Sequence, residues 1–84
     1  MKLVWTELAW ENYLFWQQTN KDILKKINIL LQKILRDPFS GIGKPEAFRS
    51  EFAGKWSRRI DHEHRLVYEI KDDMLVIYQC RYHY

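Results

Sequence analysis

Residues 55–84, KWSRRIDHEHRLVYEIKDDMLVIYQCRYHY, contain three short runs that are rich in β-branched and aromatic residues. The runs cover residues 56–60, 65–70 and 74–78, and polar, turn-forming residues separate them. Each run has the length and the composition of a strand in a globular protein. Because the connections between them are short, neighbouring strands must be antiparallel. The last third of the chain is therefore predicted to be a three-stranded meander.

The middle run has two faces of different character. Leu66, Tyr68 and Ile70 alternate onto one face, so Arg65 and Glu69 point to the other face. Arginines on strands are ordinarily solvated charge. Taken together with the other basic residues of the meander, they indicate one face for packing and one face that binds phosphate groups. Those other basic residues are Arg58, Arg59, Arg81 and His83.

The first part of the chain predicts a strand at residues 2–5 and two helices. Thr6 can cap a helix that runs from Glu7 to about Gln18, and Asn20 can cap the next. Asp37, which precedes a proline, ends the second helix. A turn of two residues between the helices makes them an antiparallel hairpin. The second helix carries apolar residues at the spacing of one buried face, at Ile23, Leu24, Ile27, Leu30, Leu31 and Ile34.

The apolar stripe of the hairpin and the apolar face of the meander both need a partner surface, and each can cover the other. We therefore predict one α+β domain over residues 1–84. An N-terminal strand and a helical hairpin pack on a mainly antiparallel sheet. A chain of 84 residues can bury one modest core of this kind.

Charge and composition restrict the partners and the compartment. Lys and Arg number 14 against 11 Asp and Glu, a formal charge of +3, which permits an anionic partner without requiring one. No basic tail is present, so a basic patch must be assembled by folding. The single cysteine, Cys80, excludes an internal disulfide. No apolar run approaches the length of a membrane span and no cleavage signal opens the chain, so we expect a cytoplasmic protein with no membrane partner.

A loop rich in glycine and proline, residues 39–49, joins the helices to the meander. It lacks the spacing of a P-loop. In it Lys44 and Arg49 bracket Glu46, which gives a carboxylate in a basic setting or, alternatively, an ordinary surface glutamate. Zinc ligation by His62, His64, Cys80 and His83 is a further alternative. We expect no metal site, because the two turn histidines lie in a tight turn and the cysteine in an apolar strand.

Four separated segments resemble the YoeB/Txe toxins, which are mRNA interferases of the RelE/ParE superfamily. The segments are GKPE at residues 43–46, KWSRRI at 55–60, EHRLVY at 63–68 and CRYHY at 80–84. The resemblance covers essentially the whole chain. It implies a microbial-RNase (RelE-like) fold and a toxin of a type II toxin–antitoxin system that cleaves mRNA in the A site of the 70S ribosome. It also implies neutralisation by a YefM/Axe-type antitoxin, and it leaves a homodimer open.

The resemblance further implies active-site roles for Glu46, Arg65, His83 and Tyr84. The 2′-hydroxyl of RNA can attack its own adjacent phosphate, a reaction that needs a base, a cation and an acid but no cofactor. Glu46 can be the base, Arg65 the stabilising cation and His83 the acid. Substrate binding is expected from the remaining basic residues and one aromatic residue, namely Lys44, Arg49, Arg58, Arg59, Arg81 and Tyr82.

The predicted pairing of the last two strands places Arg65 and His83 on opposite faces of the sheet. A two-residue turn at residues 72–73 pairs Arg65 with Cys80, and parity then places His83 on the face opposite Arg65. To place Arg65 and His83 on the same face, the chain therefore needs a bulge near the terminus, or a tail that leaves the sheet.

Two alternatives to a ribonuclease fit the same chain. A ParE-like relative would poison DNA gyrase and would not need the acid–base pair of Glu46 and His83. A module that binds the ribosome or an antitoxin without catalysis would use the arginine face for docking alone. The presence of a complete acid–base set favours the nuclease.

Overall fold

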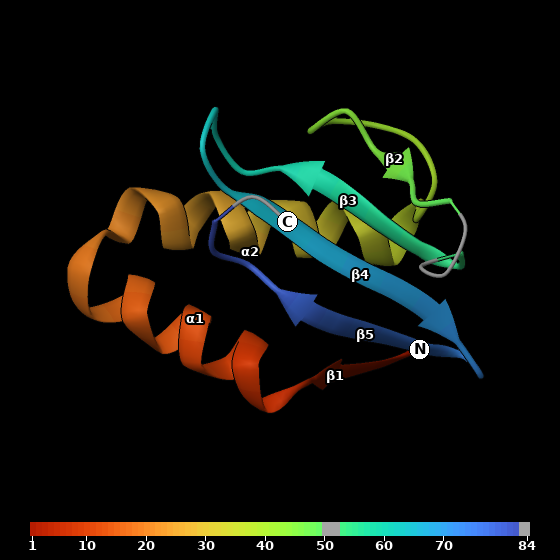
Figure 1. Cartoon of the computed structure of the whole chain (residues 1–84), viewed down its shortest axis with the longest axis horizontal. Helices are drawn as coiled ribbons and strands as arrows, with labels where there is room; N and C mark the ends of the chain where they lie inside the picture. The colour runs from red at the N-terminus through yellow and green to blue at the C-terminus, as the bar shows by residue number, and fades with distance from the viewer. Residues whose placement is uncertain (50–52, 83–84) are drawn as a thin grey trace.

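The strands form one five-stranded sheet in the order β1-β5-β4-β3-β2 (Figure 1). The structure is a computed structural model, and it describes residues 1–49 and 53–82. Only the β1–β5 pair is parallel, and the other three pairs are antiparallel. The α+β class, with an N-terminal strand on a mainly antiparallel sheet, is therefore confirmed. The strands are β1 (Lys2–Trp5), β2 (Glu46–Ala47), β3 (Lys55–Arg59), β4 (Arg65–Lys71) and β5 (Met74–Gln79).

Two helices cover one face of the sheet, and α2 runs behind β4 in the view of Figure 1. Helix α1 (Glu7–Thr19) begins after Thr6, whose hydroxyl accepts a hydrogen bond from the Ala9 N–H at 3.1 Å. Helix α2 (Lys21–Arg36) begins after Asn20, whose side-chain oxygen accepts from two backbone N–H groups of the first turn. Asn20 is both the C-cap of α1 and the N-cap of α2. The connection is therefore one residue, not the two that the sequence predicted.

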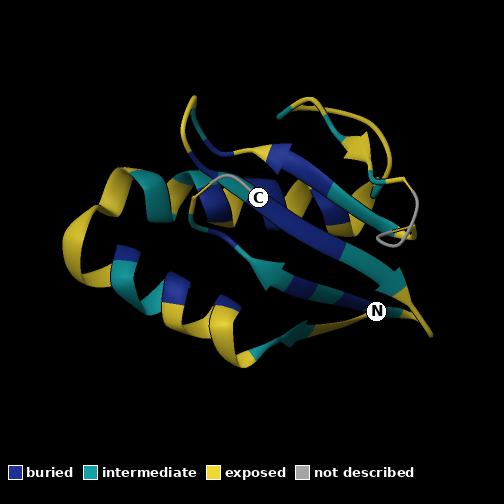
Figure 2. Ribbon diagram, viewed as in Figure 1, coloured by how far each residue is buried: buried dark blue, intermediate teal, exposed yellow. Residues whose placement is uncertain are grey.

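The core lies between α2 and the sheet. The predicted stripe of α2 faces it, since Ile27, Leu30 and Ile34 are fully buried. On the sheet Leu66 and Tyr68 are fully buried as well, and Figure 2 shows this buried band along β4. Each large aliphatic side chain removed from water in this way contributes about 1.5–3 kcal/mol to folding. The apolar stripe of α2 thus packs against the apolar face of the sheet, as the sequence predicted.

The strand pattern differs from prediction at the sheet edge. Strand β3 covers Lys55–Arg59 rather than residues 56–60. Strand β2, Glu46–Ala47, lies in the segment that was expected to be a loop, and it pairs with residues 56–57 of β3. Two residues are too few to give a periodic signal, so this strand exists through pairing and not through local preference. Within residues 1–49 and 53–82, no helix has the length and apolar character needed to cross a membrane.

Candidate active site

The face of the sheet opposite the helices brings together residues from three strands. Glu46 of β2 pairs with Ser57 of β3, and Ser57 pairs with Val67 of β4. Arg59 pairs with Arg65 two positions further along the same strands. Because side chains alternate along a strand, Glu46, Arg59 and Arg65 lie on one face. A carboxylate and two guanidinium groups therefore share the side of the sheet that the helices leave uncovered.

A bulge in β5 changes the register near the end of the sheet. Val67 and Tyr68 are consecutive on β4, yet they pair with Gln79 and Ile77 of β5. Tyr78 is therefore an extra residue on β5. One extra residue reverses the parity of every position that follows it.

The chain after the bulge returns to Arg65. The Arg65 N–H donates to the Tyr82 carbonyl at 3.0 Å. The predicted pairing of Arg65 with Cys80 is therefore wrong. Strand β5 contains the bulge at Tyr78 and ends at Gln79. Both features named as ways to bring Arg65 and His83 to one face, a bulge and a tail that leaves the sheet, are therefore present. His83 and Tyr84, the next two predicted site residues, lie outside the described residues.

Side chains of α1 and of the β3–β4 turn hold this tail. The Trp16 indole N–H donates to the Cys80 carbonyl at 2.8 Å, and the Asn12 side-chain oxygen accepts from the Cys80 N–H at 3.0 Å. The Tyr82 N–H donates to Nδ1 of His64 at 2.7 Å. Tyr82 itself has a φ of +66°, a left-handed conformation that is uncommon for an aromatic residue. The path of the tail is therefore fixed by several hydrogen bonds up to its last described residue.

The β3–β4 turn is rigid in its own right. The Asp61 carboxylate accepts from the backbone N–H groups of Glu63 and His64, at 2.9 and 2.7 Å. Burial alone would raise the pKa of Asp61, but the hydrogen bonds from His64 and Glu63 outweigh it, so this pKa lies below its ordinary value. Nη1 of Arg65 donates to the Asp61 carbonyl at 3.1 Å. The turn thus orients the guanidinium that was predicted to stabilise the phosphate.

Arg58 has a different role from the substrate contact that the sequence suggested. It is fully buried, because it shares the core face of the sheet with Tyr68. Its guanidinium donates to the carbonyls of Asp37, Ser40 and Ile42 at 2.7, 2.8 and 3.1 Å, and Nε donates to the Tyr68 hydroxyl at 3.2 Å. Arg58 therefore orders the loop that leads to β2, and we correct the prediction that it binds substrate.

That loop delivers Glu46 and its basic neighbours to the sheet edge. The Arg59 N–H donates to the Gly43 carbonyl at 2.6 Å. Gly43 has a φ of +84°, and a Cβ there would lie 3.0 Å from Cδ2 of Leu30, so a larger residue would be strained and tightly packed. Lys44 and Arg49 are exposed on either side of β2. The two basic residues that flank Glu46 in the sequence are thus exposed next to this edge of the sheet.

A second carboxylate lies on the same face. The Tyr78 hydroxyl donates to Oε1 of Glu69 at 2.6 Å. This hydrogen bond, assisted by burial, raises the pKa of Tyr78 to about 12. Nζ of Lys55 lies 4.7 Å from the centroid of the Tyr78 ring. The bulged tyrosine is therefore tied to β4 by its side chain.

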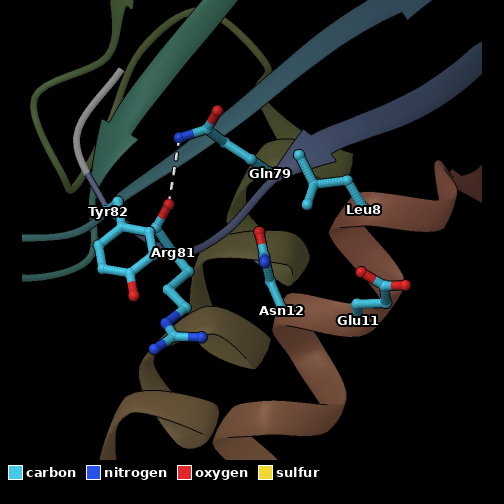
Figure 3. Close-up of a pocket in the computed structure, with 6 residues that line it drawn as sticks. All are labelled: Leu8, Glu11, Asn12, Gln79, Arg81 and Tyr82. Carbon is cyan, nitrogen blue, oxygen red and sulfur yellow. Dashed lines mark hydrogen bonds between the residues drawn. The ribbon is translucent and has the colours of Figure 1, made fainter.

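Arg81 and Tyr82 lie beside α1, at the end of β5. The Arg81 guanidinium is 3.5 Å from the centre of the Phe15 ring and 4.5 Å from that of Tyr82. Both residues line a hollow of about 370 Å³ between the tail and α1, together with Gln79 and with Glu11 on the helix (Figure 3). Tyr82 is 54% exposed. Arg81 and Tyr82 thus border a hollow beside α1, while the Tyr82 backbone also contacts Arg65 of β4.

Three residues that support the site were not predicted to do so. His64 was considered as a zinc ligand, and the sequence assigned Trp16 and Asn12 no contact with the end of β5. Asp61, a turn former three residues before His64, was the available signal for a fixed turn. No local pattern could have identified the helix residues, since their partner is Cys80, far away in the sequence.

Metal ligation has no support from the described ranges. Within residues 1–49 and 53–82, no group of three or more His, Cys, Asp or Glu side chains could hold a metal ion. Nδ1 of His64 already accepts a backbone hydrogen bond. Burial raises the pKa of the Cys80 thiol to about 12, which opposes the thiolate that a metal needs.

The sequence and the structure were compared with known proteins. A family model described as "YoeB-like toxin of bacterial type II toxin-antitoxin system" matches residues 5–84. Toxin YoeB of Escherichia coli (strain K12) is 56% identical over 84 residues, which cover all of both chains. Toxin YoeB of Synechocystis sp. (strain PCC 6803) is also 56% identical, over all of this chain and 98% of the relative.

Solved structures agree with these sequence matches. A YoeB/ParE toxin from Agrobacterium tumefaciens superimposes with a TM-score of 0.98 at 49% identity, over the full length of both chains. A YoeB dimer from Staphylococcus aureus gives a TM-score of 0.93 at 46% identity. A YoeB–YefM complex from the same organism gives 0.91 at 47% identity. Each of the two covers all of this chain and 98% of its own.

Proposed function

This chain belongs to the YoeB-like toxin family of bacterial type II toxin–antitoxin systems, and we propose that it is a ribosome-dependent endoribonuclease that cleaves mRNA in the A site. The observation that carries the proposal is the return of the chain to Arg65. The hydrogen bond from the Arg65 N–H to the Tyr82 carbonyl brings Tyr82, the residue before His83 in the sequence, to the first residue of β4, and Arg65 shares its face of the sheet with Glu46. In this proposal the acid–base pair, Glu46 and His83, and the phosphate-binding cation, Arg65, act together on one substrate.

The proposed reaction is a transesterification within the RNA. Glu46 takes the proton of the 2′-hydroxyl while the 2′-oxygen forms a bond to the adjacent phosphorus. The bond from phosphorus to the 5′-oxygen breaks, and protonated His83 gives its proton to that oxygen. The products are a 2′,3′-cyclic phosphate and a free 5′-hydroxyl.

Cations on the open face stabilise the charge that develops on the phosphate. Arg65 is the proposed principal contact, because its own turn orients its guanidinium. Arg59 shares its face, and Lys44 and Arg49 lie exposed on either side of Glu46. Tyr84 and Tyr82 contribute by stacking on the substrate nucleotides or by hydrogen bonding to them.

The modest charge of the chain supports dependence on the ribosome. Electrostatic affinity for RNA grows with the number of phosphates neutralised, and a formal charge of +3 provides few such contacts. Free RNA should therefore bind weakly, and a ribosome that holds the message in place would supply the missing orientation. This role places the protein in the cytoplasm.

We further propose two protein partners. An antitoxin of the YefM type binds a relative that is 47% identical to this chain, and an acidic segment of such a partner would cover the basic face. A homodimer is proposed because a relative at 46% identity forms a dimer. Both partners are expected to leave the fold of the toxin itself unchanged.

The test is toeprinting with purified protein on a message that is being translated and on the same message free in solution. We expect cleavage within the A-site codon of the translated message, faster by orders of magnitude than cleavage of the free one. Equal rates on both would overturn ribosome dependence. Ribosome binding without cleavage would favour a docking module, and DNA damage on induction would favour a gyrase poison.

A further inference from the structure

His64 is a buried histidine that the proposed chemistry does not use. It is 6% exposed and lies in the turn that precedes β4. Its ring packs edge-on against Trp16, with 4.7 Å between the ring centres. A histidine in such a position can simply fill space, so the hydrogen bonds of its two nitrogens decide what it does.

The protonation of the ring follows from its partners. A backbone N–H can only donate, so Nδ1 of His64, which lies 2.7 Å from the Tyr82 nitrogen, must accept and carries no proton. The proton of the neutral ring is then on Nε2, which lies 3.5 Å from Oε1 of Glu63. The described contacts thus favour one tautomer, with its lone pair directed at the tail.

Tyr82 is held from both sides by two consecutive residues. Its N–H donates to the side chain of His64, and its carbonyl accepts from the backbone N–H of Arg65. A left-handed aromatic residue persists only when its surroundings over-determine its conformation, and these two bonds do so. The bond to Arg65 joins two backbone groups, so a substitution of the His64 side chain removes neither its donor nor its acceptor. The bond to His64 depends on one side-chain atom.

We infer that His64 is a positioning residue whose Nδ1 fixes the Tyr82 backbone and thereby directs the chain into His83 and Tyr84. The inference rests on the proposed function, because it assigns catalysis to those two residues. His64 itself does not touch the substrate. Without its acceptor, Tyr82 can leave the left-handed conformation, and the acid that follows loses its fixed starting point. A displacement of about 1 Å at a catalytic group can lower the rate by about 10²-fold.

Three variants separate the acceptor from the packing of the ring. His64→Asn keeps an acceptor oxygen at the same number of bonds from the backbone as Nδ1. His64→Gln carries the same amide one methylene further out. His64→Leu fills similar space with no acceptor. All three lose the edge-on ring contact with Trp16, so the effect of losing that contact is common to them. Cleavage is compared per folded molecule after thermal unfolding of each variant.

Two readouts are measured for each variant. The first is single-turnover cleavage on saturating programmed ribosomes, with the ribosome concentration at half-maximal rate. The second is hydrogen exchange of the Tyr82 amide by NMR. We expect His64→Gln and His64→Leu to lower the rate about 10²-fold at unchanged half-saturation and to expose the Tyr82 amide to exchange. His64→Asn should stay within about threefold of wild type in rate and keep the amide protected.

Rates equal to wild type in all three variants would overturn the inference, and so would an equal loss in all three. If His64→Leu does not fold, the amide pair His64→Asn and His64→Gln decides the question alone. A wild-type protein that cleaves neither free nor translated mRNA would instead overturn the proposed function. Exchange of the Tyr82 amide reports the His64 contact independently of that result.

Discussion

The backbone N–H of Arg65 donates to the carbonyl of Tyr82 at 3.0 Å, so Tyr82 lies against the first residue of β4. This contact exists because Tyr78 is an extra residue in β5 and because the chain leaves the sheet after Gln79. It joins Tyr82, the residue before His83 in the sequence, to the strand whose Arg65 shares a face with Glu46.

Arg58 should be a stability residue and its neighbour Arg59 a functional one. Arg58→Met leaves three carbonyls and the Tyr68 hydroxyl without a buried donor, and each unsatisfied group costs about 1–3 kcal/mol. We expect a loss of at least about 3 kcal/mol in urea unfolding. Arg59→Met, at an exposed position, should change stability by less than about 0.5 kcal/mol and should slow cleavage. Equal stability of the two variants would contradict the role assigned to Arg58.

Trp16 should anchor the tail through its indole N–H. Trp16→Phe keeps an aromatic ring but leaves the Cys80 carbonyl without its donor, which should lower the free energy of unfolding by about 1–2 kcal/mol. The matched control is Trp10→Phe, because Trp10 is 46% exposed and belongs to the same helix. We expect the control to change chemical denaturation little. A Trp16→Phe variant as stable as the control would show that the indole bond is dispensable.

Tyr78 should make the protein sensitive to high pH. Its pKa is about 12 in the folded protein, above the ordinary value of about 10, so the folded state retains the proton longer than the unfolded state. The stability that this gives is complete below about pH 10 and is lost as the pH rises through about 12. Ultraviolet titration of tyrosinate should show Tyr78 ionising late, as well as Tyr68, whose pKa is raised by burial. Glu69→Gln should bring down the pKa of Tyr78 and leave that of Tyr68 raised. Unchanged late ionisation of Tyr78 in that variant would exclude the Glu69 hydrogen bond as the cause.

The proposed antitoxin should block the basic face. Co-expression with an acidic YefM-type partner encoded beside the toxin gene should give a complex that co-purifies and does not cleave mRNA. The reason is that the partner's acidic segment competes with RNA phosphate for Arg59 and Arg65. Binding should weaken as salt rises, since exposed charges are screened. Toxicity that persists at full expression of the partner would contradict this assignment.

Much of the fold could be predicted because its local signals agree. Thr6 and Asn20 cap the helices as expected, and the stripe on α2 is the buried face. The alternation of side chains along β3 also predicts the face of Arg58. It lies two residues after Trp56 and therefore on the same face of the sheet, yet it was assigned to substrate binding. An arginine is so rarely buried that its charge outweighed its position in the pattern.

The rest depended on contacts between distant residues. The bulge at Tyr78 depends on how β5 pairs with β4, and no residue type at that position predicts a bulge. Strand β2 forms because β3 offers an edge to pair with. The family resemblance proposed a set of site residues, whereas the arrangement of those that the structure describes required the register of the folded sheet.

The most direct test of the central claim is single-turnover cleavage by Glu46→Gln and His83→Ala on saturating programmed ribosomes. Glu46→Gln removes the proposed base at nearly constant volume, and His83→Ala removes the proposed acid beyond the last strand. Each should lower the rate by about 10²- to 10⁴-fold. Ribosome binding, antitoxin binding and the melting temperature should stay at wild-type values. If either variant keeps its fold and cleaves at near the wild-type rate, the acid–base mechanism assigned to that residue is wrong.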